Sequence, residues 1–128
     1  MSGGTRALRV AERVREVLMS ALLRGAVRDG GATGVTITDV RVSKDLRQAK
    51  VYIRLLLHEP GDAEKKQAVR AMTRATGLLR RELGAALRTK FTPELHFYWD
   101  DAVDRGQRVQ EVLHEISVEQ RDGDEGDD

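Results

Sequence analysis

The sequence predicts an α+β domain in which helices cover one face of a three-stranded sheet. Three observations support this fold class. Apolar residues recur at helical spacing near the start of the chain, two alternating segments rich in β-branched residues follow, and a third alternating segment comes after a long helical pattern. A chain of 128 residues is large enough to bury one hydrophobic core, so we expect one folded domain.

The first helix is expected from residue 6 to about residue 27. Its apolar residues fall at helical spacing and should share one buried face: Val10, Val14, Val17, Leu18, Ala21 and Leu22. Thr5 is a suitable N-cap, and the small, polar residues before it (1–5) are expected to be disordered. Asp29, Gly30 and Gly31 are expected to end this helix.

Two strands are expected next, over residues 35–42 and 48–57, as an antiparallel hairpin. In the first strand the apolar phase changes between Ile37 and Val40. This change indicates either a bulge near Thr38 and Asp39 or partial cover on both faces. The second strand alternates regularly and should direct one set of side chains toward the core: Ala49, Val51, Ile53, Leu55 and Leu57.

The longest helical pattern begins near Asp62, a suitable N-cap, and extends to Leu87. One unbroken helix of that length would be unusual in so small a domain. Glycine in a helix interior costs about 1 kcal/mol relative to alanine. We therefore expect two helices that meet at a kink formed by Ala75, Thr76 and Gly77.

Pro93 prevents the second of these helices from continuing into the third strand. That strand should place His96 and Tyr98 on the open face, and three larger apolar side chains toward the core: Leu95, Phe97 and Trp99. A final helix beginning near Asp101 and Asp104 and an acidic tail complete the chain. The expected divisions are a disordered N-terminus, a folded domain and a disordered acidic tail: residues 1–5, 6–117 and 118–128.

The net charge of +1 conceals a strong asymmetry along the chain. Residues 1–99 hold 19 Lys and Arg against 10 Asp and Glu, a net charge of +9. Residues 100–128 hold 3 Lys and Arg against 11 Asp and Glu, a net charge of −8. A basic domain with an acidic end indicates a nucleic acid or another polyanion as the partner, although a solubilising surface would also account for the excess.

Composition excludes several other classes. The chain has no cysteine, which excludes disulfides and thiolate metal sites. No signal peptide or membrane-spanning segment is visible, so we expect a cytoplasmic protein without a membrane partner. The three histidines are far apart in the sequence, and no nucleophile–base pair or phosphate loop is present. Asp100, Asp101 and Asp104 could gather Mg²⁺, but acidic helix starts are common caps, so no catalytic residue, metal or cofactor is expected.

A basic stripe is the first candidate site. It consists of five cations at steps of four or seven residues, which keep side chains on roughly one helical face: Lys66, Arg70, Arg74, Arg81 and Arg88. Arg80 flanks this stripe. Such a stripe can follow a phosphate backbone, or it can be only a solvated face. Glu82 is the only acidic residue between residues 65 and 90, which favours the phosphate interpretation.

The kink is the second candidate. Small residues at Ala75, Thr76 and Gly77 would let an RNA backbone approach a helix end, where exposed amides can meet phosphate. Alternatively, Gly77 only allows close helix packing. The Gly31–Gly34 segment fits the G-x-x-G pattern of KH domains, but it lies between a helix and a strand and is predicted to be a loop.

The open face of the sheet is a third candidate. Three rings could stack bases there: Tyr52, His96 and Tyr98. Lys50 and Arg54 would lie nearby. Alternatively, the rings are simply partly buried at a sheet edge.

Four segments together resemble the bacterial ribosome-binding factor A family: residues 6–18, 40–53, 74–83 and 92–113. The pairing of ATGLLRRELG with PELHFYWDDAVDRG carries most of this resemblance. It implies a type II KH-like domain in which an Ala-x-Gly kink replaces the G-x-x-G clamp, and Ala75 to Gly77 match that kink. It also implies that the kink and the adjoining Arg/Lys face contact rRNA.

The resemblance further implies a non-catalytic, monomeric assembly factor. Its partner would be the small (30S) ribosomal subunit with its rRNA. It would act in late maturation and in 16S rRNA precursor processing, notably in the cold. Two alternatives remain from the residues alone: a general single-stranded RNA-binding protein, and a protein-docking adaptor with the same fold. Equal affinity for unrelated RNA would indicate the first, and salt-tolerant binding after nuclease treatment would indicate the second.

Overall fold

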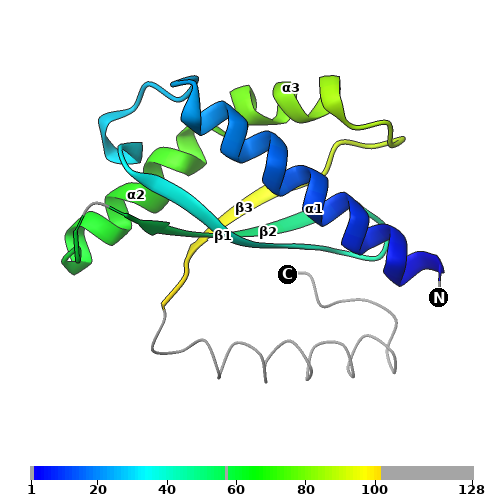
Figure 1. Cartoon of the computed structure of the whole chain (residues 1–128), viewed down its shortest axis with the longest axis horizontal. Coiled ribbons are helices and arrows are strands. Elements are labelled where there is room, and N and C mark those ends of the chain that lie inside the picture. Colours follow the sequence, from blue (N-terminus) through cyan, green and yellow to red (C-terminus); the bar gives the residue numbers. More distant parts are fainter. Residues whose placement is uncertain (1, 57, 102–128) are drawn as a thin grey trace.

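The computed structural model describes residues 2–56 and 58–101, and Figure 1 shows the arrangement of its elements. Three α-helices, one short 3-10 helix (η1) and three strands follow one another in this order: α1 Ser2–Leu23, η1 Gly30–Ala32, β1 Val35–Val42, β2 Gln48–Leu55, α2 Asp62–Arg74, α3 Thr76–Ala86 and β3 Glu94–Trp99. The prediction of helices, a hairpin, two joined helices and a third strand is confirmed.

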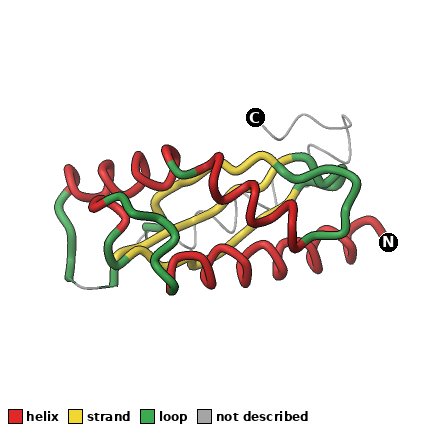
Figure 2. The backbone as a smooth tube through the Cα atoms, turned by 90° about the horizontal axis from the view of Figure 1, so that it is seen from above, coloured by secondary structure: helices red, strands yellow, loops and turns green. Residues whose placement is uncertain are grey.

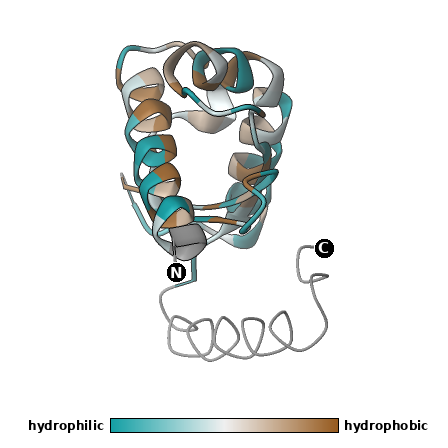
Figure 3. Ribbon diagram, turned by 90° about the vertical axis from the view of Figure 1, so that its right-hand side faces the viewer, coloured by the Kyte–Doolittle hydropathy of each residue, from teal (hydrophilic) through white to brown (hydrophobic). Residues whose placement is uncertain are grey.

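The strands form one sheet in the order β1-β2-β3. β1 pairs antiparallel with β2, and β2 pairs parallel with β3. The parallel pairing requires a crossover, which α2 and α3 supply. The helices lie on one side of the sheet in Figures 1 and 3, and the view from above in Figure 2 shows them running across it. The predicted layer of helices on one face of the sheet is confirmed.

A β-bulge in β1 explains the change of apolar phase. Ile37 pairs with Ile53 and Asp39 pairs with Tyr52, so one strand contains an additional residue. Thr38 is that residue, and its hydroxyl oxygen lies 3.2 Å from the Tyr52 carbonyl oxygen. The bulge returns Val40 to the core side, and this accounts for its burial.

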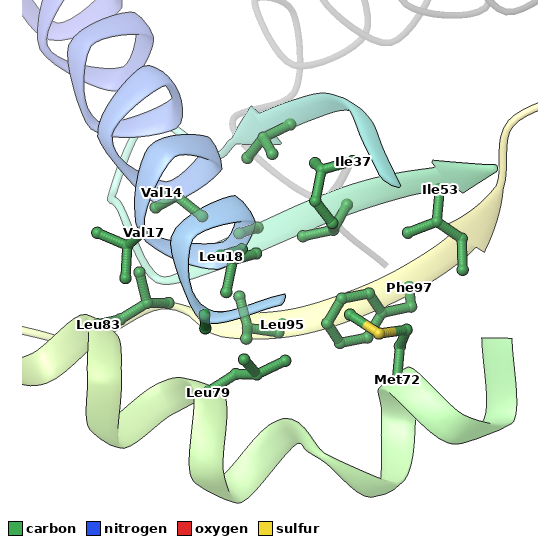
Figure 4. Packing of buried hydrophobic residues seen from close by; sticks show 14 of the residues in the cluster. Val14, Val17, Leu18, Ile37, Ile53, Met72, Leu79, Leu83, Leu95 and Phe97 are labelled. Atoms are coloured by element: carbon green, nitrogen blue, oxygen red, sulfur yellow. The ribbon is translucent and has the colours of Figure 1, made fainter. Parts of the chain in front are cut away.

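The core lies between the sheet and the helices, as Figure 4 shows in close view. Val14 and Leu18 of α1 approach the sheet from one helix, while Met72 of α2 and two leucines of α3 approach it from the others. Seven of the largest fully buried side chains come from the three helices and β2: Val14, Leu18, Val51, Ile53, Met72, Leu79 and Leu83. Each helix is therefore fixed to the same sheet face by burial of its apolar stripe.

The ends of α1 differ from the prediction. Residues 2–5, expected to be disordered, form its first turn, so the assignment of Thr5 as N-cap is wrong. Gly25, at φ 77°, terminates the helix earlier than expected. The Ala26 N–H donates to the Ala21 carbonyl at 2.9 Å and the Gly25 N–H to the Leu22 carbonyl at 3.1 Å, a Schellman motif. The glycines after Asp29 instead build η1, where the Asp29 carboxylate caps the Gly31 N–H at 3.0 Å.

Three other boundaries differ by one or two residues. β2 ends at Leu55 instead of residue 57, and β3 begins at Glu94 instead of residue 95. Gly61, not Asp62, is the N-cap of α2, and its N–H donates to the Glu64 carboxylate at 3.1 Å. The predicted final helix and the acidic tail lie outside the described residues.

Candidate nucleic-acid interface

The junction of α2 and α3 is a single residue, Ala75. It is the C-cap of α2 and the N-cap of α3, with φ −86° and ψ 3°. Its N–H still donates to the Met72 carbonyl at 3.1 Å, and its carbonyl accepts the Leu79 N–H at 2.9 Å. The two helices therefore meet without a loop, and the predicted kink at Ala75, Thr76 and Gly77 is confirmed.

Gly77 lies in the first turn of α3 and is exposed. A Cβ added at this position would have no heavy atom within 4 Å, which rules out close helix packing as the reason for glycine here. Ala75 and Thr76 beside it are only partly buried. No side chain caps the start of α3, so the N–H groups of its first turn donate no hydrogen bond to a capping side chain. Together these features make the helix start an open surface that a phosphate backbone could approach closely.

Lys66, Arg70 and Arg74 form an exposed row on α2 that ends at the kink. The row has i, i+4 spacing, so the three side chains lie on neighbouring turns of one face. Arg74 also connects the kink to η1, because its Nε donates to the Asp29 carboxylate at 2.8 Å. Its side chain nevertheless remains 61% exposed.

Arg74 also affects the titration of its partner. The hydrogen bond from Arg74 and a second from the Gly31 N–H hold the pKa of Asp29 below its ordinary value, and Asp29 in turn raises the pKa of Arg74. The pair is therefore ionised over the whole neutral range. Arg74 keeps a positive charge at the kink even while it holds η1 in place.

The basic stripe does not continue as one helical face. The helix is interrupted at Ala75 and α3 ends at Ala86, so Arg88 lies in the following loop, beyond the C-cap Leu87. Arg81 is exposed on α3. The prediction that one helical face carries all five cations is therefore wrong. Three of them form a row on α2, whereas Arg81 lies on α3 and Arg88 lies in the loop after it.

Arg80 is partly buried and has a structural role. Its Nη2 donates to the Thr92 carbonyl at 2.7 Å and its Nε to the Pro93 carbonyl at 3.1 Å. The guanidinium thereby ties α3 to the loop before β3. Sequence alone does not reveal this, since the two carbonyls belong to a loop that periodicity does not place.

The single acidic residue of this region is paired away from the α2 row. The Glu82 carboxylate forms an ion pair with Arg24, just after the end of α1. It joins α1 to α3. Within the part of the chain that the structure describes, Arg74 pairs with Asp29, and no ion pair joins Lys66 or Arg70 to a carboxylate.

The open face of the sheet gathers the residues that alternation predicted there. Lys50 pairs in register with His96, and Tyr52 pairs with Tyr98. The two tyrosine rings are 5.6 Å apart, and the Arg41 guanidinium lies 5.4 Å from the Tyr52 ring centroid. Arg41 was missed by the sequence analysis because only the register across the bulge shows that it shares this face.

Arg54 and Asp100 have structural roles at the end of the sheet. The Arg54 Nη1 donates to the Asp100 carbonyl at 2.7 Å. Asp100 is fully buried, and its carboxylate accepts from the Thr38 hydroxyl at the bulge. Asp104 lies outside the described residues, and within residues 2–56 and 58–101 no three His, Asp or Glu side chains form a metal-binding group.

These features define a small KH-like α+β domain of the kind used to bind RNA, with a helix–kink–helix where the G-x-x-G clamp would be. A model of the family described as "Ribosome-binding factor A" matches residues 6–113. The chain belongs to the ribosome-binding factor A family.

Similar proteins carry the same description. Ribosome-binding factor A of Geobacter sulfurreducens is 39% identical over 115 residues, covering 89% of this chain and 93% of that one. The protein from Xanthomonas axonopodis pv. citri is 38% identical over 108 residues, covering 84% of this chain and 79% of the relative.

Solved structures agree with this fold. The solution structure of a Thermotoga maritima protein described as a putative ribosome binding factor A has a TM-score of 0.64, at 32% identity over 76% of this chain and 89% of that one. The crystal structure of the Thermus thermophilus factor has a TM-score of 0.59, at 25% identity over 72% of this chain and 93% of that one. A homology model of the Thermus factor, fitted into a map of its complex with the 30S subunit, has a TM-score of 0.53, at 28% identity over 68% of this chain and 87% of that one.

Within the described residues, no helix is both long and apolar enough to cross a membrane.

Proposed function

We propose that this protein binds the small (30S) ribosomal subunit as a monomeric, non-catalytic assembly factor. It would support late subunit maturation and processing of the 16S rRNA precursor in the cytoplasm, notably in the cold. The observation that carries the proposal is the exposed row of Lys66, Arg70 and Arg74, which leads directly to an open helix junction at Gly77. The Thermus relative, described in complex with the 30S subunit, supports the choice of partner.

The proposed contact uses two kinds of group. The α2 cations neutralise successive phosphates, and the first-turn amides of α3 donate hydrogen bonds to one phosphate at the kink. Absence of a side chain at Gly77 lets the RNA backbone reach those amides. Arg81 extends the positive surface along α3, and Arg88 adds a cation beyond its end. These contacts fix position on the subunit without reading base identity.

Co-sedimentation with separated small and large subunits tests this proposal. Selective binding to free small subunits is expected. If about four phosphates are neutralised, affinity should fall by roughly three decades for each decade of salt. Binding to neither subunit, or to both alike, would contradict the proposal. Binding that survives high salt and nuclease would identify a protein-docking adaptor instead.

A charge variant locates the surface. Replacing Arg70, Arg74 and Arg81 by alanine should weaken binding, but Arg74 also holds Asp29, so Lys66 is the better third position. The variant Lys66→Ala/Arg70→Ala/Arg81→Ala removes only exposed cations. Its matched control removes the same charge from exposed positions on α1: Arg6→Ala, Arg9→Ala and Arg15→Ala. Equal weakening by both variants would show that net charge, and not the kink face, determines binding.

The biological role has its own test. A strain that lacks the factor should accumulate precursor 16S rRNA at low temperature, and the wild-type chain should restore processing. The triple variant on α2 and α3 should fail to restore it although it is folded. Restoration by that variant would separate rRNA processing from this surface.

A further inference from the structure

A second basic surface lies at the other end of α3. The loop between α3 and β3 and the turn between β1 and β2 lie at the same end of the molecule in Figures 1 and 2. A backbone hydrogen bond of 2.8 Å joins them, from the Glu94 N–H to the Arg47 carbonyl. α3 has 11 residues. At a rise of 1.5 Å per residue, α3 is about 16 Å long, and the loop begins at the end of α3 opposite the kink.

The loop is held in one conformation by its own hydrogen bonds. Arg80 binds the carbonyls of Thr92 and Pro93, and Pro93 itself is buried. The Thr89 hydroxyl donates to the Phe91 carbonyl at 2.7 Å. Phe91 is therefore presented on a fixed segment, so little conformational entropy would be lost when a ligand contacts it.

Phe91 is an exposed aromatic ring with two cations close to it. Its exposed fraction is 41%. The Arg47 guanidinium lies 4.2 Å from the ring centroid and the Lys90 ammonium 5.6 Å from it. A guanidinium at this distance lies over one face of the ring, and the flat groups of such a pair, the opposite ring face and the guanidinium itself, are suited to another planar π system.

The two segments that meet at this end of the molecule carry an excess of positive charge, which suits a polyanion. Lys44 and Arg47 come from the hairpin turn, and Arg88 and Lys90 come from the loop; all four are exposed. The nearby Asp45 carboxylate is occupied within the turn by the Ser43 hydroxyl at 2.7 Å and the Arg47 N–H at 3.0 Å. Glu94 is the other carboxylate in these segments, so cations outnumber carboxylates four to two.

We propose that Arg47, Lys90 and Phe91 form a second RNA contact, in which an unpaired rRNA base stacks on the Phe91 ring and its flanking phosphates meet the surrounding cations. An apolar protein partner would need only the ring, whereas a base with its phosphates accounts for the ring and the cations together. This inference rests on the proposed function. Two separate contacts, one at the kink and one on the loop after α3, would fix both the position and the direction of an RNA strand on the domain.

The test compares substitutions at position 91 for binding to purified small ribosomal subunits. Phe91→Leu keeps an apolar side chain without a π face, whereas Phe91→Tyr keeps the π face. Phe91→Leu is expected to weaken binding about tenfold, and Phe91→Tyr to leave it nearly unchanged. Arg47→Lys keeps the charge but loses the flat guanidinium, and should weaken binding by a smaller factor. Leu23→Ala, at an exposed leucine on α1, is the matched control and should have no effect.

The outcomes separate this inference from the proposed function. If the wild-type chain does not bind small subunits, the proposed function fails. If it binds and Phe91→Leu binds equally well, only the second contact is overturned. If Phe91→Ala weakens binding but Phe91→Leu does not, the ring meets an apolar group and the stacking proposal is also overturned. Thermal unfolding of each variant should match that of the wild type, which shows that the loop is intact.

Discussion

Four arginines of α2 and α3 have three different roles. Arg70 and Arg81 are exposed, whereas Arg74 is exposed and also bound to Asp29. The Arg80 guanidinium donates hydrogen bonds to two loop carbonyls. Side-chain geometry, and not residue type, therefore determines which cations remain available to phosphate. Substitution at Arg80 should therefore lower stability, whereas substitution at its neighbour Arg81 should leave stability almost unchanged and affect RNA binding.

Gly77→Ala tests whether the missing side chain serves RNA or folding. The added Cβ would meet open space, and alanine is the better helix former, so stability should be unchanged or slightly raised. Binding to small subunits should nevertheless weaken, because the methyl group occupies the approach to the first-turn amides of α3. Thermal unfolding and co-sedimentation measure the two quantities. Unchanged binding would exclude close approach of RNA at this position.

Arg80→Lys should reduce stability, because lysine cannot reproduce the two-point contact with Thr92 and Pro93. The loss in unfolding free energy should be about 1 kcal/mol, measured by urea denaturation. Arg81→Lys, at the exposed neighbour, should cost almost nothing. Equal stability of both variants would show that Arg80 does not tie α3 to the loop.

The Asp29–Arg74 pair predicts a pH dependence of stability. The pKa of Asp29 is lowered in the folded state, first by the hydrogen bond from Arg74. A carboxyl group with a lowered pKa stabilises the fold fully above its unfolded pKa and loses this contribution as pH falls through the folded pKa. Asp29→Asn should therefore be less stable than wild type at pH 7. The difference should shrink as pH falls below 3.8, the ordinary pKa. Thermal midpoints across this range measure it, and a pH-independent difference would contradict it.

At the scale of elements, α3 connects the core to both proposed RNA contacts. Leu79 and Leu83 are fully buried against the sheet, while the opposite side of the helix carries Gly77 and Arg81. Figure 4 shows the two leucines beside Leu95 of β3. Loss of this packing should disturb both ends of the helix at once.

Leu83→Ala should reduce the unfolding free energy by about 2 to 5 kcal/mol, through lost burial and a residual cavity. Urea denaturation measures the loss. Leu23→Ala removes the same atoms from a position that is 81% exposed, and should change stability by less than about 0.5 kcal/mol. A small effect at Leu83 would mean that α3 is not anchored through this side chain.

Sequence periodicity predicted the elements better than their ends. The change of apolar phase in β1 offered a bulge near Thr38 as one of two explanations, and the length of the helical pattern together with its glycines predicted the kink at Ala75. The end of α1 at Gly25 was not, because two later glycines offered an equally good stop. The structural roles of Arg80 and Asp100 depend on partners distant in sequence, which spacing cannot supply. The basic stripe was only partly predicted, since helical periodicity assumes a continuous helix.

At the scale of the whole molecule, charge is separated along the chain. Residues 1–99 carry a net charge of +9 and residues 100–128 a net charge of −8. The α2 row near the kink and the cations of the hairpin turn and the α3–β3 loop both belong to the basic part. Acidic residues joined to the same chain lower its overall attraction for any polyanion, at distances up to about 10 Å at ordinary salt.

Removing residues 119–128 should therefore reduce selectivity. This segment holds six acidic residues and one arginine, so truncation adds five positive units to the net charge. At low salt, affinity for unrelated single-stranded RNA should rise more than affinity for small subunits, because nonspecific binding depends mainly on charge. Filter binding and co-sedimentation at two salt concentrations measure both. A full-length control with its six acids changed to Asn or Gln should behave like the truncation if charge is the cause. Selectivity retained in both variants would show that the acidic end does not discriminate between RNAs.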